Sequence, residues 1–267
     1  MRDFFIGFPN RLELFGALHT AVSVIFIVLF AGIVALRKKL SEPRFHIIGK
    51  IAAYILLANM LVHYSSRIIL GIWSIEEDLP LHLCFITNFF MIYILLTDDR
   101  RGFYEIIYYF TVIGPLPAMI FPDLRFSPES WVFWQFVISH HFMLLVSVFC
   151  LAVEGYAVSL RGGAFAFIAG NVYIALVSLF NRLAGTNYAM INALPEQLYE
   201  IFPFLYALPP IVPLEAAGVI SLAAAYKFAA AFGKNVRRGK KAGFTERRCN
   251  FSEISQKRII INNNKKR

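Results

Sequence analysis

Two polar clusters interrupt apolar stretches of this sequence, and both contain residue types that do chemistry. His82 and Cys84 lie two residues apart at the start of one apolar run, and His140 and His141 are adjacent in the middle of a later run. Ionisable side chains are costly in hydrocarbon, so two such clusters indicate a functional site. An imidazole that takes the proton of a thiol allows the thiolate to attack a carbonyl and form an acyl-enzyme.

The composition indicates an integral membrane protein. Of the 267 residues, 58% are hydrophobic, whereas a soluble domain has roughly 45–50%. The formal net charge is +9, and much of the excess lies in the tail from Lys234 to Arg267. We attribute this charge to positive-inside topology and attraction to anionic lipid headgroups rather than to a nucleic-acid partner. The three cysteines form no disulfide pattern.

Seven apolar segments are each expected to cross the membrane, because about 20 apolar residues span a bilayer. They are Leu12–Leu36, Phe45–Trp73, Leu79–Leu96, Phe103–Phe121, Trp131–Val153, Ala164–Leu183 and Tyr206–Phe232. We therefore predict an all-α, multi-pass protein of the cell membrane, with one seven-helix domain over residues 1–232 and a basic, disordered tail over residues 233–267. The cationic loops share a side with this tail, so the C-terminus is expected in the cytoplasm and the N-terminus outside.

The depths of the two clusters predict that they meet. Asp78 and Pro80 indicate a helix start, so Cys84 lies about 6 residues, or roughly 9 Å, below the outer end of its segment, and His140 lies about 9 residues, or roughly 13 Å, below the outer end of its own. The thiol and the imidazole can therefore touch if the two segments are neighbours. His82 would point about 200° away from Cys84 around a helix, and the rings of His140 and His141 diverge by about 100°, so only one of them can face the thiol.

Other polar residues are candidates for supporting this site. The residues expected to support it or to line its cavity are His82, His141, Asn181, Asn187, Tyr188 and Glu215. Asn181 and Glu215 are expected to form hydrogen bonds between helices. Asn181 or Asn187 is also a candidate to orient the histidine or to donate to an oxyanion. The turn that contains Tyr188 is expected to cover the outer mouth, in a long loop that folds back over the bundle. The two prolines that follow Gly114 are expected to kink the fourth segment or end it early.

Two other functions fit the same residues. One is a transporter or binding protein for lipids or small molecules, with the polar cluster lining its cavity. The other is a metal-binding protein, although no segment has two histidines four residues apart, as a helical zinc motif does. A site that combines His19, His63, His82 and His140 stays open. We predict that the chemistry of the thiol and the imidazole uses neither a metal nor another cofactor.

Four stretches together resemble one known family. They are Leu79–Cys84, Phe136–His140, Val153–Tyr156 and Asn181–Tyr188. In this order they are similar to the YwaF-type bacterial integral membrane proteins, which are related to eukaryotic transmembrane protein 164. The resemblance runs from about Leu12 to Phe232 and leaves out the basic tail.

The resemblance implies a multi-helix membrane protein and, through the eukaryotic relatives, a cysteine-dependent fatty acyltransferase that acts on phospholipids. Those relatives are similar to membrane hydrolases of fatty-acid esters of hydroxy fatty acids, which use a Thr/His pair. Carried over to this sequence, the nucleophile falls on Cys84 and the histidine on His140. The expected partners are therefore membrane phospholipids and fatty acyl chains, with hydrolysis of lipid esters as a related reaction.

Overall fold

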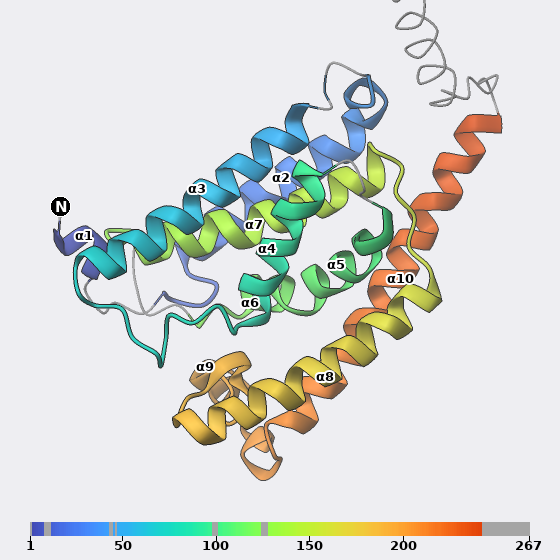
Figure 1. The fold of residues 1–267 in the computed structure, drawn as a ribbon. Coiled ribbons are helices and arrows are strands. Elements are labelled where there is room, and N and C mark those ends of the chain that lie inside the picture. The colour runs from blue at the N-terminus through green and yellow to red at the C-terminus, as the bar shows by residue number, and fades with distance from the viewer. Residues whose placement is uncertain are drawn as a thin grey trace, which may run out of the picture. The chain divides into compact units, whose positions relative to one another are not determined.

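The computed structural model describes residues 2–7, 12–42, 45, 47–97, 101–123 and 128–241, and its regular structure within these ranges is helical, with no strand (Figure 1). The helices are α1 (Arg2–Ile6), α2 (Ala17–Leu40), α3 (Ile47–Ile69), α4 (Leu83–Leu96), α5 (Arg101–Ile113), α6 (Pro115–Ile120), α7 (Trp131–Ala152), α8 (Leu160–Ala184), α9 (Glu196–Ile201) and α10 (Ile211–Lys241), with 3-10 turns at Tyr188–Met190 and Pro203–Ala207.

Six helical segments of the described chain are long and apolar enough to cross a membrane. These are α2, α3, α7, α8, the stretch Phe103–Ile120 that combines most of α5 with α6, and residues Ile211–Ala230 of α10. The remaining expected segment is helical only over the 14 residues of α4, a length of roughly 21 Å at 1.5 Å per residue. The hydrocarbon core is about 30 Å thick, so the all-helical membrane fold is confirmed while seven spans and the orientation of the termini stay predictions.

The expected break in the fourth segment is confirmed. Helix α5 ends at Ile113 and α6 begins at Pro115. Gly114 between them still donates its backbone N–H to the carbonyl of Phe110, 2.9 Å away. Pro115 and Pro117 have no N–H to donate and clash with the preceding turn, so the helix axis changes here.

The start of α4 lies later than the sequence indicated. The helix begins at Leu83, and His82 just before it has an extended backbone with φ −72° and ψ 140°. The expected separation of about 200° between His82 and Cys84 is therefore wrong, because that angle applies only when both residues lie on one helix. Cys84 is instead the second residue of α4 and lies in its first turn.

Two tyrosines hold the segment before α4 out of the helix. The hydroxyl of Tyr173 in α8 donates to the carbonyl oxygen of Leu81, 2.6 Å away. Tyr188 accepts a hydrogen bond from the backbone N–H of Leu79 at 2.9 Å and donates to the carbonyl of Ile75 at 2.7 Å. The long loop after α8 therefore does fold back onto the bundle, as its length and aromatic content indicated.

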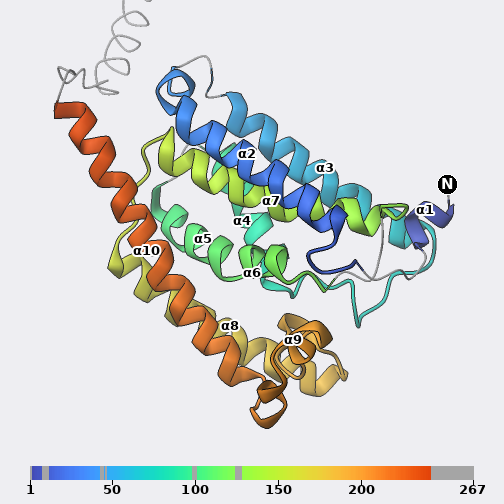
Figure 2. The same cartoon turned by 180° about the vertical axis from the view of Figure 1, so that it is seen from behind.

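Helix α7 is the central helix, and α2, α3, α4, α5 and α6 all pack against it (Figures 1 and 2). Helix α5 also packs against α8, and Tyr108 in α5 donates to the carbonyl of Ala225 in α10 at 3.0 Å. The core around α7 is built from apolar and aromatic side chains such as Leu56, Met91 and Met143, which are fully buried. The two helices predicted to carry the thiol and the imidazole, α4 and α7, are thus neighbours.

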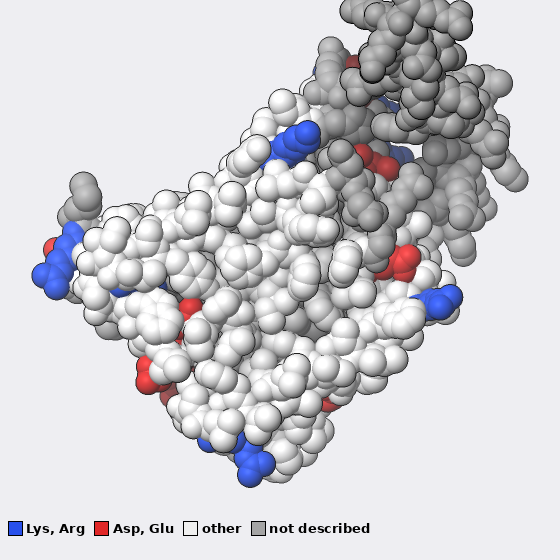
Figure 3. Space-filling model, viewed as in Figure 1, with Lys and Arg blue, Asp and Glu red and all other residues white. Residues whose placement is uncertain are grey.

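The outer faces of the bundle are apolar, as lipid contact requires. Large hydrophobic side chains are exposed along α2, α8 and α10, including Val28, Leu176 and Ile220. On the face drawn in Figure 3, charged side chains lie towards the margins and leave a central area without Lys, Arg, Asp or Glu. The chain divides into Met1–Gly233 and Lys234–Arg267. Most of the expected basic tail, with Cys249, falls outside the described residues.

Candidate functional site

Cys84 lies where a helix terminus can stabilise a thiolate. It is the second residue of α4 and is partly exposed, and the N–H of the next residue, Phe85, donates to the carbonyl of His82 at 3.0 Å. The first N–H groups of a helix have no intrahelical partner, and the N-terminal end carries a partial positive charge. Both features favour the anionic form of a thiol, which is the form that attacks a carbonyl.

His140 is buried in α7 and has a defined tautomer. Its Nδ1 lies 2.9 Å from the carbonyl oxygen of Phe136 and 3.1 Å from the hydroxyl of Ser139. A carbonyl oxygen only accepts, so Nδ1 carries the ring proton and Nε2 keeps its lone pair. The Phe136 ring stacks on the imidazole with centroids 4.1 Å apart. His140 is therefore held in the tautomer that a general base requires.

Helix α4, which carries Cys84, packs against α7, which carries His140. His82, two residues before Cys84, is near enough to His140 to interact with it electrostatically. No hydrogen bond of the described chain joins the sulfur of Cys84 to the His140 ring, and Tyr64 and Tyr173 are near enough to the thiol to interact with it electrostatically. Direct pairing of Cys84 with His140 is thus part of the proposal made below.

His141 faces a different part of the bundle. Its Nδ1 lies 2.8 Å from the carbonyl of Val137, and its ring meets Phe26 of α2 edge-on with centroids 5.5 Å apart. The adjacent histidines therefore diverge as expected. A cavity of about 10 Å³ lies beside His141 and His19, which is room for about one water molecule.

His82 is attached to the loop after α8. Its Nδ1 accepts a hydrogen bond from the backbone N–H of Ala189 at 3.3 Å, and its ring meets Tyr188 edge-on at 5.1 Å. Burial raises the pKa of the Tyr188 phenol, so this hydroxyl stays protonated and can both donate and accept. Glu215 in α10 is partly exposed, and no described hydrogen bond links it to Cys84 or His140.

The amides of Asn181 and Asn187 hold the loop itself. The Oδ1 of Asn181 accepts from the N–H of Tyr188 at 2.9 Å and from the hydroxyl of Thr186 at 2.7 Å, and its Nδ2 donates to the Tyr188 carbonyl at 2.9 Å. Asn187 is exposed and bonds to Asn192 and Ala193 in the same way. Both side-chain amides therefore stabilise the turn that positions Tyr188 and His82.

A buried ion pair that the sequence did not reveal anchors the segment before α4. Arg67 near the end of α3 pairs through Nε with Asp78, whose side chain is 2% exposed, and through a second nitrogen with Glu77 at 3.3 Å. Asp78 also accepts the backbone N–H of Ser74 at 2.8 Å. Arg67 thus ties α3 to the loop that leads into Cys84.

We expect Asp78→Ala to destabilise the protein by about 3–5 kcal/mol, because it leaves the buried guanidinium without its closest counter-charge. The measurement is equilibrium unfolding in detergent followed by circular dichroism. Glu77→Ala is the matched control, since that side chain is 74% exposed and surface pairs contribute about 0–1 kcal/mol. Equal losses in the two variants would contradict a special role for the buried pair.

The histidines do not assemble a metal site in the part of the chain that the structure describes. No group of three or more His, Cys, Asp or Glu side chains there is placed to hold a metal ion. His19 instead bonds through Nε2 to the carbonyl of Met119 at 2.9 Å, while His63 stacks on Phe85. The four-histidine arrangement that the sequence left open is therefore not formed.

Long apolar helices around a central helix, with polar side chains buried between them, define a multi-helix integral membrane protein. The model of the TMEM164 family matches residues 9–226, and the chain belongs to this family. It is also similar to a protein of Treponema pallidum (strain Nichols) that is described only as uncharacterised, with 28% identity over 196 residues, which are 71% of this chain and 79% of that protein. No solved structure matches the chain.

Proposed function

We propose that this membrane protein is an intramembrane fatty acyltransferase that acts on phospholipids through an acyl-cysteine intermediate at Cys84. The observation that carries the proposal is the position of this thiol. It lies in the first turn of α4, at the helix end whose partial positive charge favours an anion. This helix packs against α7, which carries His140 with its Nδ1 protonated.

The reaction follows from these two groups. Nε2 of His140 takes the proton of the thiol, and the thiolate attacks the ester carbonyl of the phospholipid. The carbon–oxygen bond of the ester breaks, and the imidazolium returns its proton to the departing lysophospholipid oxygen. A second lysophospholipid hydroxyl, deprotonated by His140, then attacks the thioester and releases the thiolate. Water in place of this acceptor makes the same site a lipid ester hydrolase.

The proposed topology allows acyl chains to enter from the bilayer. Seven segments would cross the membrane, with the N-terminus outside and the C-terminus in the cytoplasm, so Cys84 would lie near the outer surface. Helix α4 is the short one, and the extended segment before it would fill the remaining depth.

Formation of the adduct tests the function directly. Purified protein in detergent, incubated with a phospholipid that carries a radiolabelled acyl chain, is expected to become labelled through a bond that hydroxylamine cleaves. Mass spectrometry of peptides is expected to map the acyl group to Cys84. Absence of an adduct, or an adduct confined to Cys150 or Cys249, would contradict the proposal.

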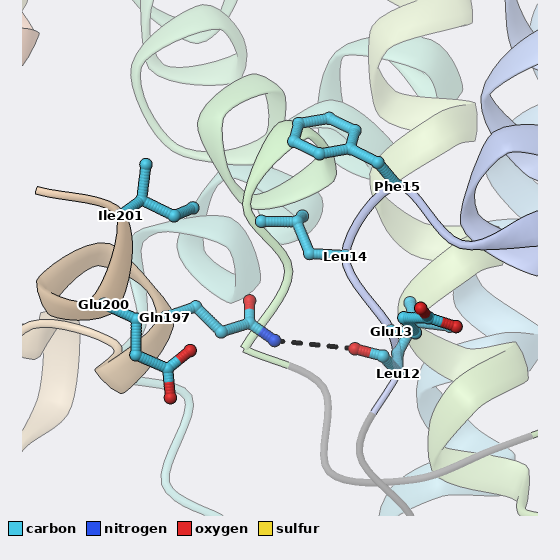
Figure 4. A pocket seen from close by; sticks show the side chains of 7 residues that line it. All are labelled: Leu12, Glu13, Leu14, Phe15, Gln197, Glu200 and Ile201. Atoms are coloured by element: carbon cyan, nitrogen blue, oxygen red, sulfur yellow. Dashed lines mark hydrogen bonds between the residues drawn. The ribbon is translucent and has the colours of Figure 1, made fainter.

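A lipid-binding protein without chemistry is the second candidate, because an open cavity of the described chain lies apart from the thiol. It measures about 490 Å³ and is lined by Leu12, Glu13, Leu14, Phe15, Gln197, Glu200 and Ile201. Figure 4 shows these side chains coming from the stretch before α2 and from α9, where Gln197 donates to the carbonyl of Leu12 at 3.5 Å. Saturable phospholipid binding without any acyl adduct would favour this candidate.

A further inference from the structure

Buried polar atoms without a hydrogen-bond partner gather where α3 packs against α4. In α3 they are Oδ1 of Asn59, Nδ1 of His63 and the hydroxyl of Tyr64, and in α4 they are both amide atoms of Asn88. Asn88 is 1% exposed. Folded proteins rarely leave buried polar groups unpaired, because the lost hydration is not replaced. A cluster of such atoms indicates that a polar group from outside the chain binds there.

Two contacts fix the register of α3 against α4. The ring of His63 stacks on that of Phe85 with centroids 6.1 Å apart. At the other end of the pair, a methyl of Leu95 lies 3.4 Å from where a side chain on Gly49 would begin. The helices are therefore antiparallel, and Asn59, about one turn before His63, lies at the level of Asn88, about one turn after Phe85.

This level is directly below the thiol. Asn88 follows Cys84 by four residues, so the two side chains share a face of α4, and helical side chains lean towards the N-terminus. The amide of Asn88 therefore reaches back towards Cys84. Tyr64, whose hydroxyl has no partner, interacts electrostatically with Cys84 and lies against Phe85 with ring centroids 5.9 Å apart.

We propose that the side-chain amide of Asn88 donates a hydrogen bond to the carbonyl oxygen of the acyl ester that Cys84 attacks. This inference rests on the proposed acyl transfer and assigns the binding site of the reacting group. When the thiolate adds to the carbonyl carbon, the electron pair of the C=O bond moves to the oxygen, and donors placed at that oxygen stabilise the negative charge. Asn88 and a backbone N–H of the first turn of α4 supply these donors.

The other asparagines named above are unsuited to this task. The amides of Asn181 and Asn187 are occupied within the loop after α8. The Nδ2 of Asn59 donates to the carbonyl of Gln135 at 3.2 Å, which leaves only an acceptor oxygen unpaired. Asn88 is the buried asparagine of the described chain whose donor nitrogen is unengaged.

The test compares two reactions of the same thiol. Acylation of Cys84 by a labelled phospholipid passes through an oxyanion, whereas alkylation by iodoacetamide displaces iodide and develops no charge on a carbonyl oxygen. We expect Asn88→Ala to slow acylation by about 10²–10³-fold and to change the alkylation rate by less than about threefold. Asn88→Ser, which keeps a hydroxyl donor, is expected to recover part of the acylation rate.

Asn171→Ala is the control outside this cluster, because Asn171 is exposed on α8 and its amide donates to the carbonyl of Phe167 in the same helix at 3.0 Å. It is expected to slow acylation by less than about tenfold. Unchanged acylation in Asn88→Ala, or equal slowing of acylation and alkylation, would overturn the role of Asn88 while leaving acyl transfer intact. If the alanine variant does not fold, the serine variant decides by the same comparison. A wild-type protein that iodoacetamide labels at Cys84 but phospholipid does not acylate would overturn the proposed function itself.

Discussion

Replacement of Cys84 by alanine is expected to abolish acyl transfer from phospholipid. Without the sulfur there is no atom at the start of α4 that can form the acyl intermediate, and the residual rate falls to that of the uncatalysed reaction. Cys84→Ser is expected to retain only a small fraction of the activity, because a hydroxyl is a far weaker nucleophile than a thiolate near neutral pH. The measurement is transfer of a labelled acyl chain between phospholipid and lysophospholipid in detergent micelles.

Cys150→Ala provides the matched control within the chain. Cys150 is 3% exposed and lies in α7 among core side chains, so it is a packing residue in this scheme. Its replacement removes one small buried group, and we expect the transfer rate to change by less than about threefold while stability falls by roughly 1 kcal/mol. Full activity in Cys84→Ala, or loss of activity confined to Cys150→Ala, would exclude Cys84 as the nucleophile.

The membrane fold was accessible from the sequence because its determinants are local. Continuous apolar length predicts helices such as α2 and α7, and a proline next to Gly114 predicts the break between α5 and α6. These features depend on residues within one or two turns of each other. The match of the family model to residues 9–226 likewise agrees with the resemblance inferred from four short stretches.

The start of α4 was not accessible because distant residues determine it. Tyr173 and Tyr188 bond to the backbone of Leu81 and Leu79, about 100 residues earlier in the chain. These bonds compete with helix formation between Leu79 and His82, where Asp78 and Pro80 indicated a helix start. Local start signals are weak compared with tertiary hydrogen bonds of this kind, so the helix begins later and the position of His82 changes.

Part of the polar interior could have been found by spacing alone. Asn59, His63 and Arg67 follow one another at intervals of four residues and so lie on one face of α3. Asn88 follows Cys84 at the same interval in α4. What the spacing could not show is the partner of each group. Asp78 reaches Arg67 only because the loop between α3 and α4 folds back, whereas the amide of Asn88 has no hydrogen-bond partner among the described residues.

Replacement of His140 by alanine is expected to lower the rate of Cys84 acylation by about 10²–10⁴-fold, the usual contribution of a positioned general base. The pH dependence provides a second measurement. In the variant the thiol must ionise without help, so its acylation rate is expected to rise by about tenfold per pH unit around neutrality. In the wild-type protein Nε2 of His140 accepts the proton, and the rate is expected to vary much less over the same range.

His141→Ala separates base catalysis from the packing of α7. His141 occupies the next position of the same helix and makes the same type of bond to a carbonyl four residues earlier, yet its ring faces Phe26 of α2. Its replacement is therefore expected to change the acylation rate by less than about threefold and to leave the pH profile unchanged. If both variants lost activity equally and kept the wild-type pH profile, the histidines would act only through helix packing, and Cys84 would need a different base. The candidate would then be His82, whose neighbours at the start of α4 include both His140 and the loop carrying Tyr188.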